Sequence, residues 1–178
     1  MFNREEYILL DEDLQAKEVY AFFGLTIFYF QVLESQLMNM ILIKAKAENI
    51  NLKTDEYDNI FRNYSDKTLG KLIDKILEIY KLNNYLTNQL RSINKKRNYY
   101  AHHYFKDWIH RLYSTDGRVE KIFEFERTLN KVKEIDKKLE YIIEPLKLEF
   151  GITEEYLSEK IREFKDGLNE NEELRYDR

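Results

Sequence analysis

The stretch VYAFFGLTIFYFQVLESQLMNMILI, residues 19–43, decides the fold class of this chain. Its apolar side chains recur every three or four residues, which is the spacing of a helix that buries one face. We therefore predict one long helix from Asp11 to about Asn49. Between Val19 and Phe30 apolar residues surround most of that helix, so we expect it to face the core on one side and a partner on the other.

The composition favours helices in the rest of the chain. The 178 residues include five Gly and one Pro, and this scarcity of helix breakers argues against a turn-rich β fold. We predict an all-α fold, an antiparallel up-and-down bundle of four to five helices. We expect a single domain over residues 1–178, with its core over about 11–168 and a frayed tail over 169–178.

Helical spacing and capping residues mark the later elements. We expect a short helix over Asp55–Arg62 and a second amphipathic helix over Leu69–Tyr80, with Ser65 or Asp66 as its cap. A third helix should run from Asn83 or Asn84 to near Lys106. We expect a fourth helix over Phe125–Phe150, which Pro145 kinks or ends near Glu144, and a last helix capped by Thr153. Between the third and fourth helices, Asp116-Gly117 with β-compatible flanks over Leu112–Val119 predicts a small β-hairpin insertion.

The sequence lacks the residues that several classes of functional site require. The chain has no cysteine, which excludes disulfides and thiolate zinc sites, and its five glycines are isolated, which argues against a phosphate-binding loop. No His-Glu-x-x-His pattern is present, so we expect no metal and no cofactor. Polar residues interrupt the most apolar stretch and acidic residues come early in the chain. We therefore expect a cytoplasmic protein without a membrane span.

Positive charge is concentrated in one part of the chain. The net charge is −4, but residues 83–118 contain seven cations and two anions, which gives +5 for that segment and −9 for the remainder. A basic segment in an acidic protein favours a local anion site. A solvated helix face is the alternative interpretation.

The basic segment contains the residues best suited to chemistry. Residues 95–105, KKRNYYAHHYF, hold an arginine, an asparagine, three tyrosines and two of the three histidines. Arginine holds a phosphate at any cellular pH, and histidine transfers protons near neutrality. These are the groups needed to cleave RNA without a metal ion, by attack of the 2′-hydroxyl on its own phosphate.

Arg97-Asn98-x3-His102 resembles the active-site motif of the HEPN superfamily, and Tyr104 extends it to the Arg-x4-His-x-Tyr form of HepT-type toxins. The resemblance covers roughly Asp11–Ile143, with only the motif specific, and it implies a helical fold. It also implies an endoribonuclease that acts as a toxin or antiphage effector. In this family Arg97 would stabilise the charge on the phosphate, His102 would act as general acid or base, and Asn98 would orient His102 or the phosphate.

The resemblance also implies binding residues and partners. Arg91, Lys95 and Lys96 would attract the backbone of single-stranded or transfer RNA. Tyr104 would hold a phosphate, stack on a base, or be nucleotidylated by a cognate antitoxin. His103, one residue off the motif, is either a peripheral RNA contact or a structural residue.

Helix geometry limits what the motif does within one chain. Arg97 and His102 are five positions apart, so about 140° of helix rotation lies between them. Either the side chains converge, the helix ends near Ala101, or a second chain completes the site. The resemblance implies the last, a two-fold dimer in which the motif helices face each other, and the aromatic first helix is compatible with such an interface.

Two other functions remain open at this stage. The chain could be a non-catalytic module that binds a nucleotide, RNA or a protein such as a nucleotidyltransferase. It could also be a structural helical protein in which Arg97 and His102 simply complement the negative end of a helix dipole.

Overall fold

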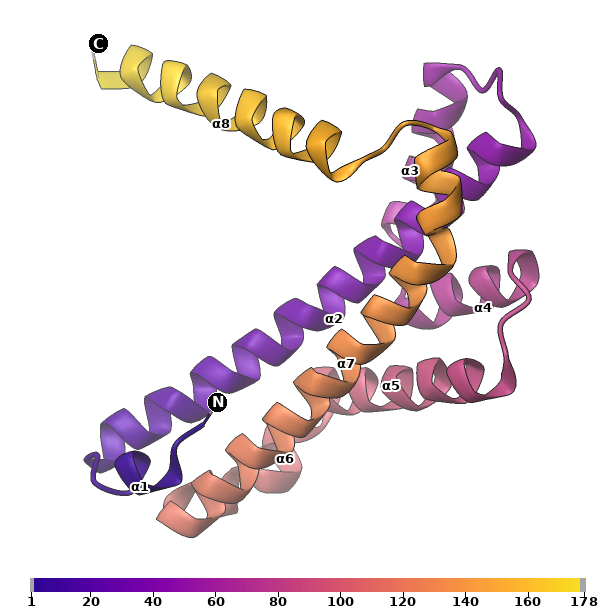
Figure 1. Ribbon diagram of the computed structural model, residues 1–178. Helices are drawn as coiled ribbons and strands as arrows, with labels where there is room; N and C mark the ends of the chain where they lie inside the picture. Colours follow the sequence, from indigo (N-terminus) through magenta and orange to yellow (C-terminus); the bar gives the residue numbers. More distant parts are fainter. Residues whose placement is uncertain (1, 177–178) are drawn as a thin grey trace. The chain divides into compact units, whose positions relative to one another are not determined.

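The computed structural model describes residues 2–176, with side chains described through residue 166. This part of the chain is helical and contains no strand, which confirms the all-α prediction. In chain order the elements are α1 (Arg4–Tyr7), α2 (Glu12–Glu48), α3 (Thr54–Ser65), α4 (Leu69–Ile79), α5 (Asn84–His102), α6 (Tyr104–Trp108), the 3₁₀ helix η1 (Ile109–Tyr113), α7 (Thr115–Glu149) and α8 (Glu154–Tyr176) (Figure 1).

The chain forms two compact units, Met1–Glu140 and Tyr141–Arg178, whose boundary falls within α7. The second unit holds the end of α7 and all of α8. Gly151, with φ +70°, separates them, and the Thr153 hydroxyl caps α8 by accepting a hydrogen bond from the Tyr156 amide at 3.2 Å. The predicted frayed tail over residues 169–178 lies where side chains are not described, and residues 177–178 lie outside the described chain.

In the first unit, α2 and α7 lie side by side and run in the same direction (Figure 1). Arg118 near the start of α7 donates a hydrogen bond to Gln15 near the start of α2, at 3.0 Å. Farther along both helices, Gln36 donates to Glu140 at 2.7 Å. Residue numbers thus rise together on the two helices, which shows a parallel pair.

Helix α5 runs antiparallel to both long helices. Against α7, Tyr100 donates a hydrogen bond to Glu124, and Lys138 donates to Gln89, so numbers rise on one helix as they fall on the other. Against α2, Arg97 pairs with Glu34, and Tyr100 packs on Phe30. Helix α4 packs on α2 and α5 with its buried Leu69, Leu72, Ile73 and Ile76, so the core of this unit lies between α2, α4, α5 and α7. The predicted up-and-down bundle stays a prediction for the chain as a whole.

The predicted β-hairpin is wrong, because residues 112–119 form the end of η1 and the first turn of α7. Ser114 has extended backbone angles, and its hydroxyl accepts a hydrogen bond from the Gly117 amide at 3.2 Å. This is the bonding of a helix N-cap, and Asp116 adds the negative charge that the first turn of a helix favours. Ser114 and Asp116 thus begin a helix where Asp116-Gly117 alone indicated a turn between strands.

Other boundaries differ in smaller ways. The α7 helix starts at Thr115, ten residues before the predicted Phe125, and it continues past Pro145, which does not end it. Proline removes one backbone hydrogen bond, the one that the carbonyl of Tyr141 would accept. The Tyr141 side chain is 82% exposed, so water can reach that turn. Thr68, whose side chain makes no capping hydrogen bond, occupies the N-cap position of α4, whereas Ser65 and Asp66 lie at the end of α3.

Candidate functional site

One face of α5 carries four of the predicted site residues. Arg91, Lys95, Asn98 and His102 follow one another at intervals of four, three and four residues, and all four are exposed. At 100° per residue this spacing places them in one stripe along the helix. We call these residues the α5 stripe. It offers a guanidinium, an ammonium, an amide and an imidazole to the same ligand.

Arg97 points away from the α5 stripe. Its Nη2 atom lies 3.2 Å from Oε1 of Glu34 on α2, and both side chains are mostly buried, at 28% and 22% exposure. His102 is exposed in the last turn of α5, where its ring neighbour is His103. A single chain therefore does not direct Arg97 and His102 at one small phosphate.

Lys96 lies on the side of α5 that faces α7. Its Nζ lies 5.9 Å from the ring centre of Tyr100. Burial lowers the pKa of Lys96, and although Glu124 opposes that shift, the cations Arg127 and Lys131 add to it. Arg127 and Lys131 were not predicted as site residues, although their spacing of four residues places them on one face of α7. They extend the positive surface from α5 onto α7.

Two of the three tyrosines of the motif region, Tyr100 and Tyr104, belong to the core. Tyr100 and Tyr104 are 2% and 1% exposed, and burial raises the pKa of both, so both hydroxyls stay protonated. Tyr100 donates a hydrogen bond to Glu124 at 2.9 Å. The Tyr104 hydroxyl is buried and has no hydrogen-bond partner among the described residues. A hydroxyl at this depth does not reach RNA at the surface, so the predicted role of Tyr104 in binding RNA is not retained.

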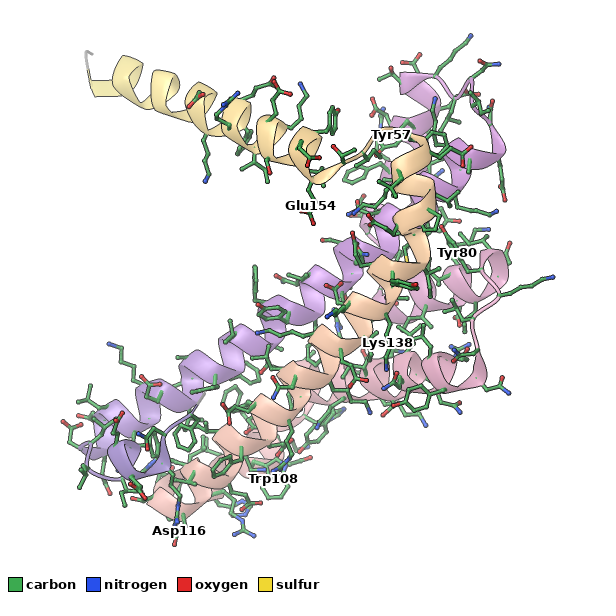
Figure 2. The ribbon with its side chains drawn as sticks, viewed as in Figure 1. Tyr57, Tyr80, Trp108, Asp116, Lys138 and Glu154 are labelled. Carbon is green, nitrogen blue, oxygen red and sulfur yellow. The ribbon has the colours of Figure 1, made fainter. Side chains whose placement is uncertain are left out.

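A buried lysine lies beneath the end of the motif segment. Lys121 on α7 is fully buried, with its Nζ 3.3 Å from the ring centre of Trp108 and 2.8 Å from Oε2 of Glu124 (Trp108 is labelled in Figure 2). Burial alone would raise the pKa of Glu124, but the hydrogen bonds from Lys121 and Tyr100 outweigh it and lower that pKa. This network holds α6 against α7 and thereby fixes the end of α5.

His103 and Arg91 have partners that solvent can reach. His103 ends α5, and its ring stacks on Tyr99 with centres 6.5 Å apart. Arg91 pairs with Asp74 on α4 at 2.6 Å, and the two side chains are 49% and 61% exposed. An exposed pair of this kind contributes about 1 kcal/mol or less, so a phosphate can displace Asp74 at low cost.

Two properties of the described residues bear on other kinds of site. They contain no group of three or more His, Asp or Glu side chains placed to hold a metal ion. One helix, α2, is long and apolar enough to span a membrane by length and composition, but 44% of its apolar window is buried inside the protein. Core helices of soluble proteins meet the same criterion, so the absence of a membrane span stays a prediction.

Comparison of the chain with protein-family models, curated proteins and solved structures gives no match. The HEPN resemblance therefore rests on the Arg97-to-His102 motif and on its place at the end of a helix. The geometry can hold a phosphodiester on the α5 stripe and can exchange a proton at His102. The cation that would stabilise a transition state, Arg97, lies on another face of the same helix.

Proposed function

We propose that the protein is a metal-independent endoribonuclease of the HEPN type that acts as a two-fold dimer. The observation that carries this proposal is the exposed α5 stripe, which joins Asn98 and His102 of the motif to two cations. The +5 charge of residues 83–118 supports an RNA ligand, because phosphate contacts dominate the affinity for RNA.

The proposed reaction is an internal transesterification. The 2′-oxygen attacks the adjacent phosphorus, the bond to the 5′-oxygen breaks, and the products are a 2′,3′-cyclic phosphate and a 5′-hydroxyl. His102 accepts the proton of the 2′-hydroxyl or supplies one to the leaving oxygen. Asn98, one turn before His102, donates a hydrogen bond to the phosphate or to the imidazole. Arg97 stabilises the negative charge that builds up on the phosphate oxygens.

The positions of these residues support a dimer. Because Arg97 and His102 lie on different faces of α5, we propose that His102 of one protomer acts with Arg97 of its partner. Leu25 and Phe28, which are 41% and 55% exposed on α2, do not adjoin this face. Leu25 and Phe28 lie about 180° and 120° around α2 from Glu34, one of the α2 residues that contact α5. We therefore place the two-fold contact at α5.

The proposed biological role is that of a cytoplasmic toxin or antiphage effector. A cognate antitoxin or nucleotidyltransferase is the partner that this role requires. Single-stranded or transfer RNA is the proposed substrate class, because its bases and its 2′-hydroxyls are open to a protein.

The test is RNA cleavage in the presence of EDTA. Purified protein is incubated with mixed single-stranded and transfer RNA, and the product ends are identified. We expect cleavage that leaves 2′,3′-cyclic phosphates, and a loss of at least about 100-fold in rate for His102→Ala. His110→Ala is the matched control, since His110 is another exposed histidine and lies outside the motif. Loss of the thermal transition in His102→Ala would assign His102 a structural role instead.

One observation favours a second candidate function. Arg97 is already neutralised by Glu34 within its own chain, which suits a non-catalytic module that binds a nucleotide, RNA or a protein. Intact RNA after incubation with a folded, dimeric protein that still binds phosphate would support this alternative.

A further inference from the structure

A cavity of about 370 Å³ lies between α2, α3 and the start of α4. Its floor is apolar and is made by Met38 and Leu72, which are both buried. Phe61 and Tyr64 of α3 form an aromatic side, and Gln31 and Glu34 of α2 add an amide and a carboxylate. Ligand sites typically measure roughly 300–1,000 Å³, so this cavity is large enough for one nucleobase.

The α3 side of the cavity is weakly anchored. No residue of α3 is buried, and Phe61 remains 48% exposed. An amphipathic helix whose aromatic residues face a cavity and stay exposed can close on a planar apolar ligand at little cost. Aromatic side chains are the usual platforms on which proteins stack unpaired bases.

Glu34 connects this cavity to the motif. Its side chain lines the cavity, and its Oε1 atom forms the ion pair with Nη2 of Arg97. Oε1 itself is buried and accepts no directed hydrogen bond from the described residues. A ligand in the cavity therefore contacts the same carboxylate that holds Arg97. A base bound there would belong to a nucleotide next to the phosphate at Arg97.

The polar residues select among the four bases. A carboxylate only accepts hydrogen bonds, whereas an amide can also donate one. Guanine presents two adjacent donors, N1–H and the 2-amino group, beside one acceptor, O6. Because Oε1 of Glu34 is buried beside Arg97, its Oε2 atom is the one that can accept from both donors. Gln31, one helical turn earlier, can donate to O6. Adenine and cytosine present a ring-nitrogen acceptor to the carboxylate, and uracil presents a single donor between two acceptors.

We infer that this cavity binds a guanine base of the RNA substrate, which places a guanosine beside the phosphate that is cleaved. This inference rests on the proposed ribonuclease function, which it extends to the sequence of the substrate. Lys67, at the rim of the cavity, supplies a cation for a neighbouring phosphate.

The first measurement is the binding of mononucleotides to the His102→Ala protein, which keeps the cavity intact. We expect 5′-GMP to bind at millimolar concentration or tighter. We expect 5′-AMP to bind at least about tenfold more weakly, because a hydrogen bond to a charged group is worth about tenfold or more. 5′-IMP, which lacks the 2-amino group, should fall between them. Equal binding of GMP and AMP, or no binding of GMP, would overturn the inference.

Single substitutions test whether GMP binds in this cavity. Phe61→Ala should weaken GMP binding about tenfold by removing the stacking surface. Tyr57→Ala is the matched control, because Tyr57 (labelled in Figure 2) lies on the same helix, is 42% exposed and does not line the cavity. Glu34→Gln should abolish the preference for GMP over AMP. If Tyr57→Ala weakens binding as much as Phe61→Ala does, the cavity is not the site.

Cleavage of a random RNA pool by the wild-type protein separates this inference from the proposed function. Cleavage with guanine enriched next to the cut supports both. Cleavage without any base preference retains the ribonuclease and refutes the guanine site. Selective GMP binding without cleavage refutes the ribonuclease and retains the site.

Discussion

At the scale of single residues, Lys121 is the clearest case of a charged side chain that is fully buried. It is buried beneath Trp108 and pairs with Glu124 three residues later, at 2.8 Å. Lys75 and Glu78 form a pair with the same spacing and the same distance, but their side chains are 27% and 68% exposed. The chain thus offers a matched comparison of a buried and an exposed ion pair.

We expect Lys121→Ala to lower the free energy of unfolding by about 3 kcal/mol, because it leaves the Glu124 charge without its main partner and opens a cavity below Trp108. Lys75→Ala should cost less than about 0.5 kcal/mol. Urea unfolding followed by circular dichroism measures both. Similar losses in the two variants would show that burial does not strengthen the first pair.

Sequence reasoning succeeds for residues whose placement follows from helix spacing alone. The separation of Arg97 from His102 is such a case, because five positions correspond to about 140° around any regular helix. It fails for pairs that depend on packing between distant segments. The partner of Arg97 is 63 positions away in sequence, and nothing in the pattern around Glu34 marks it. The sequence does not predict the burial of Lys121 either, because a lysine in a charged helix is normally exposed.

At the scale of elements, the junction between η1 and α7 shows why the hairpin prediction was wrong. Asp116-Gly117 suits a tight turn between strands, but Ser114 lies three residues before Gly117 and supplies a helix cap. In the helix, position 117 needs a glycine because a side chain would not fit there. A Cβ atom at position 117 would lie 2.0 Å from the carbonyl oxygen of Arg111.

This close approach leads to a prediction for two glycines. Gly117→Ala should lower the free energy of unfolding by at least about 2 kcal/mol, because the carbonyl of Arg111 is backbone and must move. Gly24→Ala, in the interior of α2, should raise it by about 0.5–1 kcal/mol, because no atom other than the adjoining backbone of α2 lies within 4 Å of the added Cβ and alanine favours a helix. Thermal melts of both variants test this, and equal shifts would contradict it.

At the scale of the whole molecule, the separation of Arg97 and His102 can be tested by mixing inactive proteins. Arg97→Ala and His102→Ala should each be inactive alone. After subunit exchange, half of the dimers are mixed, and each mixed dimer holds one intact site if the two residues come from different protomers. Activity should then recover to about a quarter of the wild-type value. No recovery, with exchange confirmed by mass spectrometry, would place both residues of a site in one chain.

The parallel contact between α2 and α7 has a consequence for synthesis of the protein. Gln36 and Glu140, and likewise Gln15 and Arg118, are separated by just over 100 residues. Helices α5 and α7 meet across far shorter separations, so they can associate soon after they are made. At roughly 5–20 residues per second, α2 leaves the ribosome about 5–20 s before α7 is available to cover it. Helices α4 and α5 can cover part of α2 earlier, but the side of α2 that contacts α7, which includes Phe23, stays uncovered during this interval and can bind a chaperone.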